Sequence, residues 1–178
     1  QELCNIWPEL PLSPPPGLTE VPVLPDQFVN RPEDLAKVKK LLLKEIKEPT
    51  GYLKVAIQGM GGSGKSILAA ALVLKDQDIQ QFFADGIFWI RLGKDVGSKL
   101  LQRQLSLAKA LGDTKGFQDI ETGRNRLFEL LSDRRILVVL DDLWQHDHFQ
   151  PFDALGPNCR MMVITRDLAL VKEMDFEV

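Results

Sequence analysis

The stretch Gly59-Met60-Gly61-Gly62-Ser63-Gly64-Lys65-Ser66 decides how the rest of the sequence is interpreted. It fits the pattern G-x-x-x-x-G-K-[ST], which is the phosphate-binding loop. Glycines let the backbone bend until successive amides face an anion, and a following helix directs its positive dipole end to the same place. Lys65 supplies a point charge for the β- and γ-phosphates, and Ser66 supplies a hydroxyl for magnesium. The stretch therefore predicts a phosphate site between a strand and a helix.

Apolar runs on both sides of this loop predict an α/β fold. Strands are expected where β-forming residues run continuously, at Tyr52–Gln58, Gly86–Leu92, Arg135–Asp142 and Arg160–Thr165. Helical spacing predicts helices from Pro32 to before Pro49 and over Ser66–Lys75, Asp95–Leu111 and Glu121–Leu131. Strands that are apolar throughout and alternate with helices indicate a parallel sheet buried on both faces.

The strand Ile136-Leu137-Val138-Val139-Leu140 ends in the acid pair Asp141-Asp142. This is the Walker B pattern, in which Asp141 holds magnesium and Asp142 orients or deprotonates the attacking water. Alone, the pattern is equally that of a strand followed by an acidic turn. The phosphate-binding loop upstream favours the functional interpretation.

Arg166 follows the strand Arg160–Thr165, at the end where parallel α/β sheets bind ligands. A guanidinium there could meet a γ-phosphate and sense its presence. Without further information, a solvated loop arginine is an equal alternative.

Composition excludes several function classes. The 178 residues carry 22 basic and 25 acidic side chains, a net charge of −3, which argues against a nucleic-acid binder. The longest apolar run, Ile67–Leu74, is too short for a bilayer span of about 20 residues, so no membrane partner is expected. Two cysteines, Cys4 and Cys159, are too few for a disulfide framework and are expected as reduced thiols.

Proline is concentrated at the start of the chain, with seven of the eleven prolines in the first 25 residues. Because proline removes amide donors and fixes φ, residues 1–25 are expected to form an extended linker or a disordered tail. Residues 26–178 are then the α/β domain. The start at Gln1 suggests a piece of a longer protein.

Three further candidates for chemistry carry less weight. His146 and His148 are two apart, which does not place them on one helix face, so we expect a solvated loop rather than a metal site. Cys159 has no histidine nearby in sequence that could activate it as a nucleophile.

Taken together, the loop at 59–66, Leu-Asp-Asp-Leu-Trp at 140–144 and Ile-Thr-Arg-Asp at 164–167 resemble the NB-ARC domain. That family, within the wider STAND group of signalling ATPases, includes apoptotic protease-activating ATPases and plant disease-resistance proteins. The stretches 21–25, 28–31 and 88–94 are similar to the animal apoptosome-forming branch. The resemblance covers about residues 21–178.

The resemblance implies a three-layer P-loop NTPase fold with five parallel strands. The strand before Arg166 should lie between the strands that carry the loop and the acid pair. The fifth strand would begin around Phe176-Glu177-Val178, so the domain is expected to be C-terminally incomplete. The helical and winged-helix segments that follow in the family, with their ADP-clamping motifs, are absent from these residues.

The resemblance also implies residue roles. Val29 would contact adenine through its backbone, and Arg31 would lie close to the nucleotide. Magnesium would be held by Ser66 and Asp141. Catalysis would involve Asp142, Lys65 and Arg166, the last as γ-phosphate sensor. Nucleotide binding would involve Val29, Arg31, Gly59, Gly61, Gly62, Ser63, Gly64, Lys65, Ser66 and Ile67. Ser63 stands where many relatives carry Ile or Val.

The implied function is the ATP- and ADP-binding core of an oligomerising switch in apoptosis-like or innate-immune signalling. ADP would hold a resting state, ATP with Mg²⁺ an active one, and slow hydrolysis would reset it. Partners would be further copies of the protein and an effector domain or adaptor, in the cytoplasm. A phosphotransferase and a non-hydrolysing scaffold stay open as alternatives. A GTPase is discounted because no Asn-Lys-x-Asp motif occurs.

Overall fold

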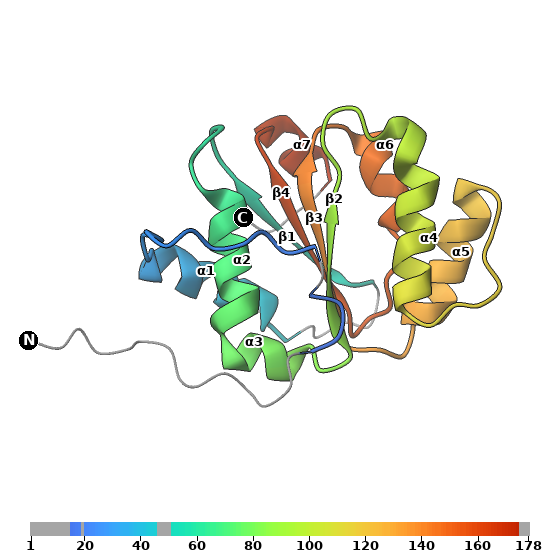
Figure 1. Cartoon of the computed structure of the whole chain (residues 1–178), viewed down its shortest axis with the longest axis horizontal. Helices are drawn as coiled ribbons and strands as arrows, with labels where there is room; N and C mark the ends of the chain where they lie inside the picture. The colour runs from blue at the N-terminus through green and yellow to red at the C-terminus, as the bar shows by residue number, and fades with distance from the viewer. Residues whose placement is uncertain (1–14, 19, 46–50, 175–178) are drawn as a thin grey trace, which may run out of the picture.

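Four parallel strands form one sheet within the residues that the computed structural model describes, namely 15–18, 20–45 and 51–174 (Figure 1). The strand order is β1-β4-β3-β2. The strands are β1 (Leu53–Gln58), β2 (Gly86–Arg91), β3 (Ile136–Leu143) and β4 (Arg160–Thr165). The strand before Arg166 therefore lies between the strand of the glycine-rich loop and that of the acid pair, as expected.

Helices cover both faces of the sheet and give the expected three layers (Figure 1). One face carries α1 (Pro32–Leu42), α2 (Lys65–Lys75) and α3 (Gln77–Phe82). The other carries α4 (Leu100–Ala110), α5 (Ile120–Leu131), α6 (His146–Phe149) and α7 (Leu168–Glu173), with 3₁₀ turns at Gly97–Lys99 and Gln150–Phe152. No helix in the described residues has the length and apolar character to cross a membrane.

The alternation of side chains along β3 explains why its sequence is apolar without interruption. Val138 and Leu140 face the core under α4 and α5, whereas Leu137 and Val139 face the core under α1 and α2. All four are fully buried. Burial of each such side chain stabilises the folded chain by about 1.5–3 kcal/mol, so packing on both faces of the sheet stabilises β3.

Some helix boundaries differ from those expected. α1 ends at Leu42, earlier than predicted, and the last turn before Pro49 falls partly on residues 46–50, outside the description. The helix predicted from Asp95 begins only at Leu100, because Gly97 and Ser98 form a 3₁₀ turn and are poor helix formers. The predicted start of a fifth strand at Phe176–Val178 also lies outside the described residues.

Helix α3 was not predicted, because six residues are too short to show helical periodicity. Its start is nevertheless encoded locally. The Asp76 carboxylate accepts a hydrogen bond from the backbone N–H of Ile79 at 3.1 Å, which caps the helix. Asp76 also pairs with Lys39 of α1 at 2.8 Å, so the cap joins two helices.

The described part of the proline-rich segment lies along the edge of β2 (Figure 1). The carbonyl of Pro16 accepts a hydrogen bond from the Ile87 N–H at 2.9 Å. Glu20 pairs with Arg103 of α4 at 3.2 Å, and Val21 packs on the core beneath α2. This exposed edge strand is thus covered by the segment that precedes the domain.

A buried glutamine connects α4 to its neighbours by hydrogen bonds. Gln104 is fully buried, and its side-chain amide donates to the carbonyls of Ile120 at 3.1 Å and Pro151 at 2.7 Å. We expect Gln104→Leu to lower the free energy of unfolding by about 2 kcal/mol, because both carbonyls lose their donor in the interior. Urea denaturation followed by circular dichroism measures this.

The matched control is Gln102→Leu, on the exposed face of the same helix. It should change the free energy of unfolding by less than about 0.5 kcal/mol. Equal stability of the two variants would contradict the conclusion that the hydrogen bonds of Gln104 stabilise the packing of α4 against α5 and the Gln150–Phe152 turn.

Candidate functional site

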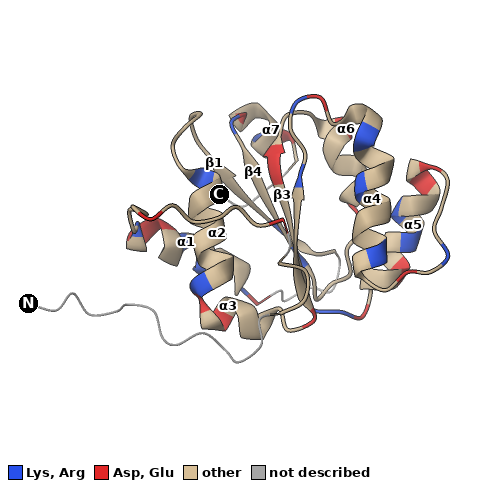
Figure 2. Ribbon diagram, in the orientation of Figure 1, with Lys and Arg blue, Asp and Glu red and all other residues tan. Residues whose placement is uncertain are grey.

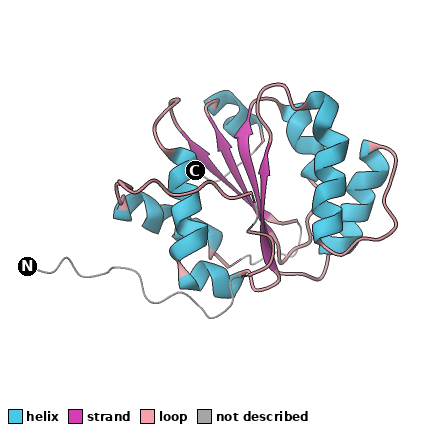
Figure 3. Ribbon diagram, in the orientation of Figure 1, coloured by secondary structure: helices cyan, strands magenta, loops and turns pink. Residues whose placement is uncertain are grey.

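All four strands end at the same edge of the sheet, because they run parallel (Figure 3). Ligands of open α/β sheets bind outside this carboxyl edge. A cavity of about 420 Å³ lies there, and it brings together residues that are distant in sequence. Its lining consists of Pro22, Gly62, Gly64, Lys65, Ser66, Ile67, Arg91, Asp141, Asp142, Ile164, Thr165 and Arg166.

The start of α2 is built to receive an anion. Gly64 stands at the N-cap with a φ of 80°, and no side chain caps the helix, so its first amides remain available. Gly62 also has a positive φ, 76°, which L side chains rarely adopt. No acidic residue occupies the first turn of α2. The glycines and the helix end thus present donors without a competing carboxylate.

Lys65 folds back over this loop. Its ammonium donates to the carbonyls of Gly59 and Met60, both at 2.7 Å, and to the Ser63 hydroxyl at 3.4 Å. Burial, and then the nearby positive charge of Arg166, lowers the pKa of Lys65. The charge of Lys65 is therefore held at an energetic cost, which a bound anion would offset.

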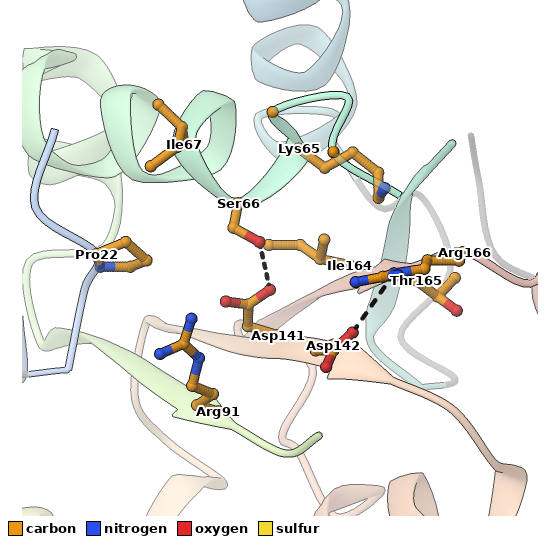
Figure 4. Close-up of a pocket in the computed structure, with 12 residues that line it drawn as sticks. Pro22, Lys65, Ser66, Ile67, Arg91, Asp141, Asp142, Ile164, Thr165 and Arg166 are labelled. Atoms are coloured by element: carbon orange, nitrogen blue, oxygen red, sulfur yellow. Dashed lines mark hydrogen bonds and ion pairs between the residues drawn. The ribbon is translucent and has the colours of Figure 1, made fainter. Parts of the chain in front are cut away.

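Ser66 and Asp141 join the glycine-rich loop to β3 (Figure 4). The Ser66 hydroxyl donates to the Asp141 carboxylate at 2.7 Å, and Asp141 is only 1% exposed. A hydroxyl and a carboxylate are the hard oxygen ligands that Mg²⁺ prefers. The donor set therefore fits this cation. The red end of β3 in Figure 2 marks the acid pair.

A bulge in β3 turns the two acids in different directions. Leu140 pairs with Val163 of β4 but Leu143 pairs with Thr165, so β3 has one residue more than its partner here. Asp142 is the only non-glycine residue of the described chain with a positive φ, 60°. Its carbonyl accepts from the N–H of Gly93 at 3.1 Å, which holds the strained backbone in place.

Arg166 reaches over the cavity from the end of β4. Its Nε lies 3.9 Å from the Asp142 carboxylate. The Thr165 hydroxyl donates to the carbonyl of Leu143 at 2.8 Å, and this fixes the turn that carries the arginine. A Cβ at Gly61 would come within 2.8 Å of Nη1 of Arg166, so a larger residue there would displace the guanidinium from this position.

Trp144 was not recognised from sequence as a site residue. The centroid of its ring lies 5.3 Å from Cζ of Arg166 and 5.8 Å from Nζ of Lys94. Both distances are within the range of cation–π contacts. The available signal was an aromatic residue two positions after the acid pair. Arg91, Pro22 and Thr165 were also missed as lining residues of the cavity.

A second cavity, of about 520 Å³, adjoins the first at Lys65. Arg31, Gly59 and Ser63 line it, together with the apolar side chains Val38, Leu41, Ile57 and Leu68. Ser63 lines this second cavity and not the first, and its hydroxyl lies 3.4 Å from Nζ of Lys65. Val29 lines neither cavity and is 74% exposed, so its contact with a base stays a prediction.

The structure corrects the expectation that His146 and His148 lie in a solvated loop. Both belong to helix α6, in which His146 is half-buried and His148 is buried, since this helix packs beneath β3. Cys159 is buried as well, and its thiol donates to the carbonyl of Arg134 at 3.2 Å. Burial raises the pKa of Cys159, which disfavours the thiolate that a nucleophile needs.

Comparison with known families accounts for this arrangement. Residues 31–177 match the NB-ARC domain. This chain belongs to the NB-ARC family. Membership agrees with the strand order and with the P-loop type of α/β fold described above. Nucleotide binding is the property that this membership implies for the chain.

Among curated proteins, this NB-ARC chain is similar to animal and plant proteins. It is 33% identical over 159 residues to apoptotic protease-activating factor 1 of Danio rerio, and 33% identical over 154 residues to that of Homo sapiens. These alignments cover 84% and 83% of this chain. Disease resistance protein RGA2 of Solanum bulbocastanum is 31% identical over 121 residues, which cover 68% of the chain. The chain spans 12% of the length of each relative.

The backbone strain at Asp142 can be tested by measuring the stability of variants at this position. We expect Asp142→Val to lower the free energy of unfolding by about 1–2 kcal/mol, because a β-branched side chain tolerates positive φ poorly. Asp142→Asn should leave stability nearly unchanged, because asparagine adopts this conformation readily. Urea denaturation of both variants measures the difference, and an equally stable Asp142→Val variant would contradict the strain.

Proposed function

We propose that this NB-ARC chain binds ATP and ADP with Mg²⁺ and is the nucleotide-dependent core of a signalling switch. The observation that carries the proposal is the hydrogen bond between Ser66 and Asp141. It places a hydroxyl–carboxylate pair beside the glycine-rich loop, in the cavity that Lys65 and Arg166 also line (Figure 4). Loop, cation ligands and arginine are thus assembled around one cavity.

The two adjoining cavities suggest how a nucleotide would lie. The phosphates would occupy the cavity of Lys65 and Asp141, where amides and cations face inward. The base and ribose would extend past Lys65 toward the cavity lined by Arg31 and by apolar side chains of α1 and α2. Arg31 lies close enough to Gly64 to contact a nucleotide on the loop, since Nη2 is 4.0 Å from a Cβ built at Gly64.

Magnesium would be held by Ser66 and Asp141, whose oxygens already face one another at 2.7 Å. When bound, the ion supplies positive charge to the β- and γ-phosphate oxygens. The Asp141 carboxylate is buried, and its hydrogen bond to Ser66 orients it toward the loop.

Hydrolysis would depend on Asp142 and Arg166. Asp142, partly exposed at the cavity, would accept a proton from a water that attacks the γ-phosphate. Arg166 is 3.9 Å from that carboxylate, so a γ-phosphate would compete with Asp142 for the guanidinium. Arrival of a triphosphate would then release Asp142 for its role as a base. We expect turnover to be slow.

The names of the relatives suggest the setting of the switch. They are an apoptotic protease-activating factor and a disease resistance protein, and we propose a comparable signalling role for the protein to which this chain belongs. ADP would stabilise a resting state and ATP an active, self-associating one, acting with an effector domain or adaptor in the cytoplasm. A ligand shifts such an equilibrium only through its difference in affinity for the two states.

Lys65→Ala tests nucleotide binding. We expect the affinity for both ADP and Mg-ATP to fall by at least about 100-fold, because a charge-assisted contact to the phosphates is lost in a partly buried site. Isothermal titration calorimetry on the full chain measures this. Lys109→Ala, on the exposed side of α4, is the matched control and should bind as the parent does. Equal affinity of Lys65→Ala and the parent would refute the site.

Asp142→Asn separates a hydrolysing switch from a binding scaffold. We expect Mg-ATP affinity within about threefold of the parent, and turnover reduced by about 100-fold or more, because the amide cannot accept the proton. Release of inorganic phosphate from the full chain is the measurement. A parent protein that binds ATP without turnover would support the scaffold, and a phosphorylated small molecule would support a kinase.

A further inference from the structure

Arg91 is a third cation at the cavity, beside Lys65 and Arg166. It is the last residue of β2 and pairs in register with Asp141 of β3. In Figure 4 its guanidinium points into the space that Ser66 and Asp141 also face. The side chain thus enters the site from the strand opposite to that of Arg166.

The two other cations are engaged with protein groups. Lys65 donates to the carbonyls of Gly59 and Met60, and Arg166 contacts Asp142 and the ring of Trp144. The side chain of Arg91 has no hydrogen bond, ion pair or aromatic contact with any residue of the described chain. Its register neighbour Asp141 is already bonded to Ser66. The donors of Arg91 are therefore available to a ligand.

Strand order determines which part of a nucleotide Arg91 can reach. Since β3 lies between β2 and β4, the acid pair is flanked by Arg91 on one side and Arg166 on the other. The first amides of α2 would face the phosphates nearest the loop. A phosphate group beyond them, above Asp141, would lie between the two guanidiniums.

We infer that Arg91 binds the terminal phosphate of a nucleoside triphosphate and contributes to selection of the triphosphate over the diphosphate. This inference rests on the proposed function of the same cavity. A planar guanidinium fits two phosphate oxygens at once, which an ammonium cannot do. Three cations against two carboxylates leave the lining with a net positive charge, which suits the additional charge of a third phosphate.

A solvated arginine without a ligand is the competing interpretation, and binding measurements distinguish the two. Isothermal titration calorimetry on the full chain would use ADP and a non-hydrolysable ATP analogue, both with Mg²⁺. We expect Arg91→Gln to weaken binding of the triphosphate about tenfold, with ADP affinity within about twofold of the parent. The triphosphate affinity of Arg91→Lys should fall between those of the parent and of Arg91→Gln, because lysine keeps the positive charge but cannot bind two phosphate oxygens at once.

Arg103→Gln is the matched control, because Arg103 lies on α4 and pairs with Glu20 rather than facing the cavity. It should bind both nucleotides as the parent does. Unchanged triphosphate affinity in Arg91→Gln, or an equal loss for both nucleotides, would overturn the inference while the parent still binds nucleotide. A parent that binds neither nucleotide would overturn the proposed function as well. If Arg91→Gln does not fold, an Arg91→Lys variant with parental affinity and selectivity would overturn the inference.

Discussion

The parallel direction of the strands is the constraint on which the site depends. Because every described strand ends at the same edge, the loop after β1, the acid pair of β3 and the arginine after β4 meet there without long connections. The hydrogen bond of Ser66 to Asp141 then joins the first helix of the site to the central strand. Strand β4 lies between β1, which leads into the loop, and β3, so the sheet itself sets the separation of the loop and the acid pair.

Some features at this edge are unfavourable for the folded chain itself. Asp142 has a left-handed backbone, and burial and the nearby charge of Arg166 lower the pKa of Lys65. The two apolar cores on either face of the sheet offset these terms. Such a concentration of locally unfavourable choices is expected where a structure is adapted to a ligand.

Much of this arrangement could be predicted from the sequence, because it depends on local patterns. The glycine-rich loop, the strand before Asp141 and the parallel sheet buried on both faces are encoded in short motifs and in continuous apolar runs, whereas the three-layer P-loop fold was implied by the family resemblance. What could not be predicted depends on distant contacts. The burial of His148 comes from packing of α6 beneath β3, and the place of Arg91 follows from strand register. Helix α3 was missed because it is too short to be periodic.

Arg166 illustrates how the site could convert binding into a change of state. Its guanidinium lies within reach of Asp142 and the Trp144 ring, and it packs over the backbone of Gly61. These contacts are weak individually, since the side chain is 52% exposed and the ion pair is 3.9 Å long. A phosphate that bears two charges would therefore outcompete them. In the proposed switch, this exchange of partners would couple binding of the third phosphate by Arg166, after β4, to the contacts of Asp142 in β3. Because the Trp144 ring contacts both Arg166 and Lys94, the residues after β2 would be affected as well.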